Sequence, residues 1–414
     1  MQRRVVITGA GVITPVGKSL DEFWNNLIAG KCGIDLIEGI DEEMTVKVAG
    51  QVKQFDPAAH GLDRNEARRS DRYSQFAVAA SIEAMRQADL EVGRNIEASR
   101  LGVYIGSGIG GMNTFVEQTK TLLEEGTRRI SPLFIPMMIS NIAAGNVAIR
   151  FGAQGPILPS VSACATSTNT AGEAFRAIKH GYADAILTGG SEAAVHPLAI
   201  GGFANSKALS LSDAPRRASI PFHKERNGFV IAEGAGILIF EELEHALKRG
   251  ATILAEVVGY GNTCDAYHYT APQPDGGPAS LAIRQALDEA EYQAGEALYV
   301  NAHGTSTPLN DKTETLVLKL ALGEEEAKRA SVSSTKSMTG HMLGAAGAVE
   351  LIASAMALKT GIVPPTIGLD CPDEECDLDY TPLKARERKL DVAISNSLGF
   401  GGHNACVALR RWDG

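Results

Sequence analysis

The feature that most constrains this fold is a weak internal repeat, in which two distant segments follow the same order of elements. Residues Ser162–Phe175 place a small polar turn at the start of a long helix, which leads to the apolar run Ala183–Gly190. Residues Ser334–Glu350 do the same and lead to Asp391–Gly402, which again ends in glycines. This repeat predicts a duplicated unit with a functional site between its two copies.

Apolar segments rich in β-branched residues alternate with helical patterns along both predicted halves, residues 1–250 and 251–414. Such alternation predicts an α/β protein with a mainly parallel, buried sheet. The predicted strands are Val5–Thr8, Leu101–Ile105, Ala185–Thr188, Ala235–Phe240, Ile253–Tyr260, Leu298–Asn301, Ala330–Ser333, Val392–Ser395 and Ala405–Arg410. The predicted helices are Ser19–Ala29, Tyr73–Gln87, Ala163–His180, Glu242–Arg249, Gly277–Ala290, Asp311–Leu322 and Gly344–Thr360.

The composition disfavours several function classes. Acidic residues outnumber basic ones, 49 to 39, and the net charge of −10 disfavours general binding to nucleic acid or to an anionic membrane. The six cysteines include no C-x-x-C pair, which argues against zinc ribbons and thioredoxin-like redox sites. We expect neither a signal peptide nor a transmembrane helix, and therefore a cytoplasmic protein.

One motif suggests a nucleotide but is better explained by packing. Residues Gly106–Gly111 match G-x-G-x-x-G directly after a predicted strand. A dinucleotide site would need this loop to open a helix, and the next strand to end in an acidic residue. No second strand clearly follows within about 30 residues, so we interpret these glycines as close backbone packing or the wall of a pocket.

The turn Val161–Thr168 contains the strongest catalytic signal. Cys164 lies among small residues where a helix begins, and the free amides and helix dipole there favour an anion. Such a position would lower the pKa of the thiol and raise its thiolate fraction. The alternative is a buried structural cysteine, the usual role of a free cysteine in a reducing compartment.

Three further segments supply candidate partners for this thiol. His303 follows the predicted strand Leu298–Asn301, at a strand end where ligands commonly bind, although a capping or core histidine is the alternative. Lys336 and His341 precede a helix rich in small residues, and the glycine-rich loop Asn396–Asn404 would offer amide donors or serve only as a turn. One thiol, two imidazoles, one lysine and an amide-rich loop are together the components of acyl transfer through a thioester.

With these segments in view, the sequence resembles the β-ketoacyl-acyl-carrier-protein synthases almost from end to end. The resemblance rests on the Cys164 turn and on Gly261–His268, Asn301–Thr307, Lys336–His341 and Gly399–Gly402. It implies a thiolase-like fold, in which two similar α/β halves pack as five α-β-α-β-α layers, and it implies a homodimer. Three residues depart from the common family pattern: Ser167, His223 and Leu398. Leu398 lies where it would alter the gate of the acyl pocket.

The resemblance implies a decarboxylative condensation that elongates a fatty acyl chain by two carbons. Cys164 would carry the acyl group, while His303 and His341 would stabilise the enolate formed from malonyl-acyl carrier protein. The backbone amides of Cys164 and Phe400 would form the oxyanion hole, and Phe400 would also be the gate residue.

The resemblance also bears on charge and cofactors. Lys336 would tune the two histidines with Glu314 as its partner, or would form only a structural salt bridge. No redox cofactor or metal is required by the chemistry. Some members of the family bind a monovalent cation, Na⁺ or K⁺, at positions that correspond to Asn301, Glu350 and Asn396.

Substrate-binding positions are implied by the same resemblance. Thr305 and Thr307 would bind the phosphopantetheine amides, and Thr270 would also contact the substrate. Ile109 and Phe203 would line the acyl chain, together with Phe134 from the other subunit. Core packing is the alternative for the three apolar residues.

The implied partner, acyl carrier protein, is strongly acidic, so this acidic chain would need local positive charge to bind it. The candidate residues are Arg64, Arg68, Arg69, Arg128, Arg129 and Lys207. A solvated helix face is the alternative interpretation of these charges.

Three other functions compete with this one. A biosynthetic thiolase would use coenzyme A and a second catalytic cysteine, for which Cys406 is the only late candidate, in a context that reads as strand. A chain-length-determining partner subunit of a polyketide system would lack the nucleophile that Cys164 provides. A polyketide ketosynthase remains an alternative, and the sequence does not determine the preferred acyl chain length.

Overall fold

The computed structural model describes residues 3–39 and 43–414, and in these residues one sheet contains nine strands in the order β4-β5-β6-β1-β7-β13-β12-β8-β9. In chain order the strands are β1 Val5–Ile13, β4 Leu101–Gly106, β5 Ala185–Glu192, β6 Gly234–Glu242, β7 Ala255–Cys264, β8 Leu298–Asn301, β9 Ser331–Ser333, β12 Val392–Gly399 and β13 His403–Arg410. Two short ribbons lie outside this sheet, formed by β2 Asp35–Leu36 with β3 Val48–Ala49 and by β10 Ile362–Val363 with β11 Arg386–Glu387.

All nine predicted strands are present, but the prediction of a mainly parallel sheet is wrong. Only the pairs β4–β5, β12–β8 and β8–β9 run parallel, and the other five pairs are antiparallel. Short connections are one reason for the antiparallel pairs. The loop between β12 and β13 is too short for a crossover, so the two strands it joins must run antiparallel.

The internal repeat is visible in the strand order. The series β4-β5-β6-β1 and the series β8-β12-β13-β7 each contain one parallel pair followed by two antiparallel pairs. The two series meet only where Val5–Ile7 of β1 pairs with Ala255–Val257 of β7. The chain is therefore built from two similar α/β units, and the placing of their boundary at residue 250 stays a prediction.

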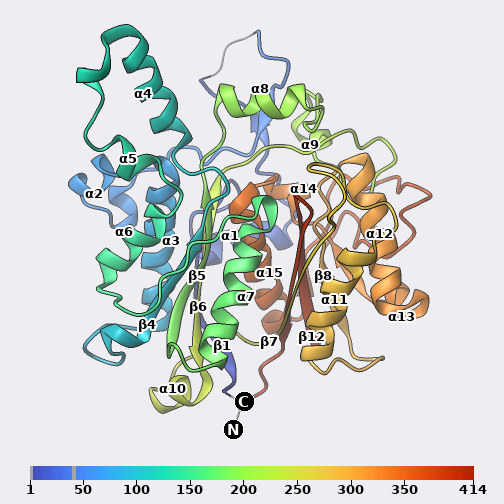
Figure 1. The fold of residues 1–414 in the computed structure, drawn as a ribbon. Coiled ribbons are helices and arrows are strands. Elements are labelled where there is room, and N and C mark those ends of the chain that lie inside the picture. Colours follow the sequence, from blue (N-terminus) through green and yellow to red (C-terminus); the bar gives the residue numbers. More distant parts are fainter. Residues whose placement is uncertain (1–2, 40–42) are drawn as a thin grey trace.

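Helices complete the five layers, as Figure 1 shows. The outer layers are α3 with α6 on one side and α11 with α12 on the other, and α7 with α15 form the central layer between the two units. The helices are α1 Leu20–Ile28, α2 Arg64–Arg68, α3 Arg72–Ala88, α4 Met112–Glu125, α5 Phe134–Met138, α6 Ile142–Phe151, α7 Thr166–Lys179, α8 Pro197–Asn205, α9 Pro215–Ala218, α10 Leu243–Lys248, α11 Gly277–Glu289, α12 Pro308–Leu322, α13 Glu324–Arg329, α14 Lys336–Thr339 and α15 Ala346–Thr360.

The central helices explain the small residues in the repeat. Helix α15 is buried on every side from Ala346 to Leu358, as expected for a helix packed between the strands of the two units. The window Leu343–Thr360 is long and apolar enough to cross a membrane, but 89% of it is buried inside the fold, which is the position of a core helix. Helix α7 approaches β7 so closely that a Cβ on Gly172 would lie 2.2 Å from the ring of Tyr260.

Both central helices begin in the same way. A single 3₁₀ turn precedes each of them, Ala163–Ala165 before α7 and Leu343–Ala345 before α15. In each turn a non-glycine residue takes a left-handed conformation, with φ of +50° at Ala163 and +46° at Leu343. Strained residues of this kind persist only where surrounding contacts maintain them. Here the two turns contact each other, which brings Cys164 close to the residues after His341.

Candidate active site

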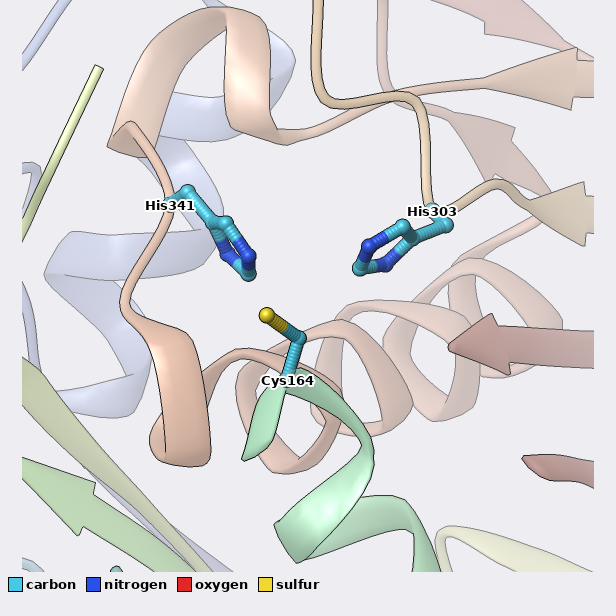
Figure 2. Close-up of side chains that lie close together, drawn as sticks. All are labelled: Cys164, His303 and His341. Atoms are coloured by element: carbon cyan, nitrogen blue, oxygen red, sulfur yellow. The ribbon is translucent and has the colours of Figure 1, made fainter. Parts of the chain in front are cut away.

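Three side chains from three separate elements meet between the two units, as Figure 2 shows. Cys164 lies in the 3₁₀ turn before α7, His303 follows β8, and His341 lies between α14 and the turn before α15. One ligand atom from each, the thiol sulfur and two imidazole nitrogens, lies within 4.8 Å of the others. The two imidazole rings are 5.4 Å apart between centroids and nearly perpendicular. The spacing suits proton transfer, and the donor set is also one that zinc accepts.

The three side chains line a cavity of about 370 Å³ that is open to solvent. Eight of the residues predicted for the site line this cavity: Cys164, Lys207, Thr270, His303, Thr305, Thr307, His341 and Phe400. The hydroxyl oxygens of Thr305 and Thr307 are 3.0 Å apart on its wall. The sulfur and both imidazoles are therefore accessible to a ligand that enters past these hydroxyls.

Lys336 lies next to the His303 ring, and the prediction that Glu314 is its partner was wrong. The ammonium group pairs with the carboxylate of Glu350 rather than with Glu314, and both members of the pair are almost completely buried. Lys336 Nζ is 3.5 Å from Nδ1 of His303. An ammonium group only donates hydrogen bonds, so Nδ1 is the acceptor and the ring proton belongs on Nε2.

Glu314 holds the backbone around His303 instead. Its carboxylate accepts hydrogen bonds of 2.7 Å from the amides of His303 and Gly304, and one of 2.9 Å from the side chain of Asn396. These bonds fix the end of β8 relative to β12. The pair Lys336–Glu350 and the carboxylate of Glu314 thus act on opposite ends of the same histidine.

Burial and the Lys336 charge set the protonation states of the three groups. Burial raises the pKa of the Cys164 thiol to about 11, although the Lys336 charge and a hydrogen bond from the Phe400 amide oppose the shift. The expectation of a lowered thiol pKa at the helix start is therefore wrong, because the loss of solvent outweighs the helix terminus. Burial and Lys336 hold the pKa of both His303 and His341 well below the usual value near 6.5.

The resting site thus contains a thiol and two neutral imidazoles. Among residues 3–39 and 43–414, neither ring nitrogen of His341 has a hydrogen-bond partner, although both are buried. An unpaired, buried imidazole is costly unless a ligand or a reacting group uses it. The thiol proton therefore stays on the sulfur at rest, and the nitrogens of His341 are available to substrate or to that proton during the reaction.

The glycine-rich loop after β12 lies directly against the cysteine turn. A Cβ on Gly399 would lie 2.7 Å from the carbonyl oxygen of Ser162, so only glycine allows this approach. The approach brings the amide of Phe400 to the sulfur of Cys164, to which it donates a hydrogen bond. The Phe400 ring lies 6.4 Å from that of Phe203 between centroids.

Two of the predicted acyl-channel residues pack beside Cys164. Ile109 and Phe203 belong to an apolar cluster with Phe229 and Leu343, which Cys164 also contacts. Phe134 lies elsewhere, on α5, where its ring faces Phe115 at 6.4 Å. Its role at the site of another subunit stays a prediction.

The amides of the G-x-G-x-x-G loop bind a carboxylate of the same chain. The carboxylate of Glu192, at the end of β5, accepts hydrogen bonds from the amides of Gly108 and Ile109, from the hydroxyl of Ser107 and from the amide of Gly344. The amides that would bind a pyrophosphate are therefore satisfied within the chain. The loop is a pocket wall, and Glu192 ties it to the turn before α15.

Four buried oxygen atoms on β8, β12 and α15 have no hydrogen-bond partner in the part of the chain that the structure describes. They are Oδ1 of Asn301, Oε2 of Glu350, Oγ of Ser395 and Oδ1 of Asn396. Ser395 and Asn301 are paired neighbours on β12 and β8, and the Asn301 side chain donates to the backbone of Glu350 at 3.2 Å. Unpaired carbonyl, hydroxyl and carboxylate oxygens suit a hard cation, so the three predicted residues, with Ser395 added, fit such an ion.

The predicted basic residues are exposed. Arg64, Arg68 and Arg69 lie on α2 and its C-terminal cap, and none of them forms an ion pair within residues 3–39 and 43–414. Arg129 pairs with Glu125 at 3.8 Å, and the neighbouring Arg128 is free to solvent. Lys207 differs from the others because it lies on the cavity rim itself.

The remaining predictions concern the three residues that depart from the family pattern and the competing thiolase function. Ser167 accepts a 2.9 Å hydrogen bond from Ala348, which links α7 to α15, and Leu398 lines the cavity. His223 is buried 2.8 Å from the carboxylate of Asp370. Cys406 is completely buried in β13, does not line the cavity, and has a pKa raised by burial. It cannot serve as the second nucleophile that a thiolase needs.

Sequence reasoning missed several residues that shape the site. Glu192 and Ser395 lie against segments far apart in the chain, and Glu350 was not expected to pair with Lys336. The only available signal was that each is a polar residue within an apolar or glycine-rich segment. A polar residue in such a position is usually buried with a partner.

Comparisons with known proteins agree with this geometry. The model of the β-ketoacyl synthase N-terminal domain matches residues 2–246, and that of the C-terminal domain matches residues 254–370. Proteins named 3-oxoacyl-[acyl-carrier-protein] synthase 2 are 51% identical to this chain in Synechocystis sp. and 50% in Staphylococcus aureus strain COL, each match covering 99% of both chains.

Solved structures show the same fold over the full chain. A β-ketoacyl synthase from Burkholderia phymatum has a TM-score of 0.92 at 33% identity, with all of both chains covered. A chain from the complex of a type II PKS acyl-carrier protein with its ketosynthase has a TM-score of 0.90 at 36% identity, again covering both chains fully. With Cys164, His303 and His341 converging as described, the chain belongs to the β-ketoacyl synthase family.

Proposed function

We propose that this chain elongates fatty acyl groups as a 3-oxoacyl-[acyl-carrier-protein] synthase of the type named for its relatives. The reaction is the condensation of an acyl thioester with malonyl-acyl carrier protein, with loss of CO2. The observation that carries the proposal is the accessible Cys164 thiol, which faces two neutral imidazoles within 4.8 Å. A chain-length-determining subunit would lack this nucleophile.

In the first half-reaction the Cys164 sulfur attacks the carbonyl carbon of the acyl thioester. The thiol proton moves to the unpaired imidazole of His341, and from there to the departing carrier thiol. The amide of Phe400, which points at the sulfur, is positioned to stabilise the oxyanion together with the amide of Cys164. The acyl chain would extend into the apolar cluster that contains Ile109 and Phe203.

In the second half-reaction the malonyl thioester loses CO2, and the electrons of the broken C–C bond form an enolate. Nε2–H of His303 donates to the enolate oxygen, since Lys336 occupies Nδ1, and His341 donates beside it. The enolate carbon then attacks the acyl-Cys164 carbonyl. A C–C bond forms, the C–S bond breaks, and Cys164 leaves as a thiolate, which takes up one proton from solvent through the open cavity.

The experiment separates the two half-reactions. Mass spectrometry would measure acyl transfer to the enzyme, and release of labelled CO2 would measure decarboxylation. Cys164→Ala should abolish acylation, whereas His303→Ala should retain acylation and lose decarboxylation. Cys32→Ala, which changes a cysteine outside the cavity, is the matched control. Acylation of the Cys164→Ala protein would refute the proposal.

A second copy of the chain completes the proposed enzyme. Residues 156–161 lie beside β4, where Ile157 forms an isolated bridge with Val103, and Ile157, Leu158 and Val161 are about half exposed. Both edge strands are covered by their own chain, β4 by residues 156–158 at Val103 and β9 by Asp379 and Thr381 at Val332. An exposed apolar segment at the edge of the sheet, such as residues 156–161, favours pairing with another copy.

The proposed partner and environment follow from the chemistry. The exposed arginines of α2 and Lys207 on the cavity rim would receive an acidic acyl carrier protein, and Thr270, Thr305 and Thr307 would contact its phosphopantetheine arm. A monovalent cation would be held by the unpaired oxygens of Asn301, Glu350, Ser395 and Asn396, and the Glu350 carboxylate would then be shared between this ion and Lys336. Six free cysteines suit the reducing cytoplasm.

A further inference from the structure

The turn that carries Thr305 and Thr307 is held in an unfavourable conformation. Gly304 has a φ of +36° and Ser306 a φ of +69°, which is left-handed for a residue with a side chain. The turn lines the cavity, and the separation of the two threonine hydroxyls depends on its shape. Backbone strain of this kind costs about 1–3 kcal/mol and persists only where neighbouring contacts maintain it.

Those contacts come from a segment of the other unit, residues 219–229, which we call the strap. The amide of Gly228 donates to the carbonyl of Ser306 at 3.1 Å, and the amide of Ile220 donates to its hydroxyl at 3.0 Å. The amide of Phe222 donates at 2.8 Å to Asp311, in the helix that follows the turn. The strap thus contacts both the turn and the start of the helix that follows it.

Arg226 is the centre of this clamp. Its guanidinium donates to two consecutive carbonyls of the turn, that of Thr307 at 3.2 Å and that of Pro308 at 2.9 Å. It is 7% exposed, and its charge is balanced by Asp373 at 2.6 Å and by the buried Asp311 at 3.6 Å. Only the planar, forked guanidinium reaches both carbonyls and both carboxylates at once.

We propose that Arg226 is a positioning residue that sets the Thr305–Thr307 turn for recognition of the pantetheine arm of the substrate. This inference rests on the proposed function. Arg226 neither lines the cavity nor touches the reacting groups, so it acts through the turn alone. Its loss would remove the guanidinium from the Thr307 and Pro308 carbonyls and leave the carboxylates of Asp311 and Asp373 without their cation. The strained turn could then relax, which displaces the hydroxyls.

The experiment compares two acyl donors that differ only in the arm. One is an acyl-pantetheine thioester, and the other is the same acyl group on ethanethiol, which has no amides for the threonines. Acylation of Cys164 is followed by mass spectrometry over a range of donor concentrations. In Arg226→Gln the concentration of acyl-pantetheine for half-maximal rate should rise roughly tenfold, with the maximal rate and the ethanethiol reaction changing less than about twofold.

Arg94→Gln is the matched control. Arg94 has the same charge and pairs with Asp89 and Glu91 beyond the end of α3, and within the described residues no interaction joins it to the strap or to the turn. It should leave the kinetics with both donors unchanged. In a Thr307→Ala background, Arg226→Gln should add little further loss, because the two residues act through the same contact.

Two variants keep the proposal testable if Arg226→Gln folds poorly. Arg226→Lys should recover part of the pantetheine selectivity, and Asp373→Asn, which retains the arginine, should show a smaller loss of the same kind. Equal losses with both donors, or no change with either, would overturn the role of Arg226. A wild-type protein that is not acylated at Cys164 would overturn the proposed function itself, and with it this inference.

Discussion

At the scale of single residues, burial and one positive charge control the site. Burial lowers the pKa of both imidazoles, and Lys336, which faces Nδ1 of His303, lowers it further, while Glu350 balances the charge of the lysine. The pKa of Glu350 rises to about 7 because burial outweighs the effect of the lysine. The histidines therefore remain neutral donors over the pH range in which a malonyl thioester would react.

The neutral histidines make stability depend on pH. In the unfolded chain His341 takes up a proton near pH 6.5, whereas in the folded chain its pKa is far lower. The unfolded state therefore binds more protons below pH 6.5, and stability is lost as the pH falls. His341→Gln should remove about 1.4 kcal/mol of this loss per pH unit between pH 6 and 5, measured by urea unfolding.

His180→Gln, at an exposed position, is the control for this measurement and should keep the wild-type slope. A His341→Gln protein with the same pH dependence as wild type would show that the imidazole is not held neutral.

At the scale of elements, two central helices bring the reactive groups together. Each begins with a strained turn, and helix α7 packs against β7 of the other unit at Gly172. The hydroxyl of Tyr260, on β7, donates to the side chain of Asn169 on α7 at 2.8 Å. The position of Cys164 therefore depends on a contact two turns further along its helix.

Gly172→Ala tests this contact. A Cβ there would lie 2.2 Å from the buried Tyr260 ring, so we expect a loss of about 2–3 kcal/mol in the free energy of unfolding. Gly201→Ala, on α8, meets nothing within 4 Å and should be neutral or stabilise by up to about 1 kcal/mol. Thermal and urea unfolding of both variants would check the difference, and equal effects would contradict the close packing of α7 on β7.

At the scale of the whole molecule, charge and shape are unevenly distributed. The net charge is −10, yet the arginines of α2 are exposed without ion pairs in the part of the chain that the structure describes. The chain covers both edge strands of the sheet, and the segment 156–161 beside β4 exposes apolar side chains. The proposed partners, an acidic carrier and a second copy, would account for both features.

Reversal of Arg68 and Arg69 to glutamate tests the carrier surface. We expect at least a tenfold weaker affinity for acyl carrier protein at low salt, a smaller difference at high salt, and unchanged reaction with small thioesters. Lys359→Glu with Lys384→Glu makes the same change of net charge at exposed positions elsewhere. Binding by surface plasmon resonance would compare the pairs, and an equal loss in both would refute a local patch.

The exposed edge predicts a dimer that charge can break. Leu158→Asp with Val161→Asp should shift the protein from dimer to monomer in sedimentation velocity, because two carboxylates would be buried against their counterparts. Leu247→Asp places the same charge at a half-exposed leucine on α10 and should leave the dimer intact. A wild-type monomer, or a double variant that remains dimeric, would contradict this assignment.

The sequence by itself determined the elements and the reacting groups. Alternating apolar patterns are local, so all nine strands could be placed, and the small residues around Cys164, His303 and His341 marked the turns that meet in the site. The tertiary structure alone decided the strand directions, the pairing of Lys336 with Glu350 rather than Glu314, and the raised pKa of the thiol. These depend on which distant segments meet and on how far they exclude water, and neither quantity is carried by local residue patterns.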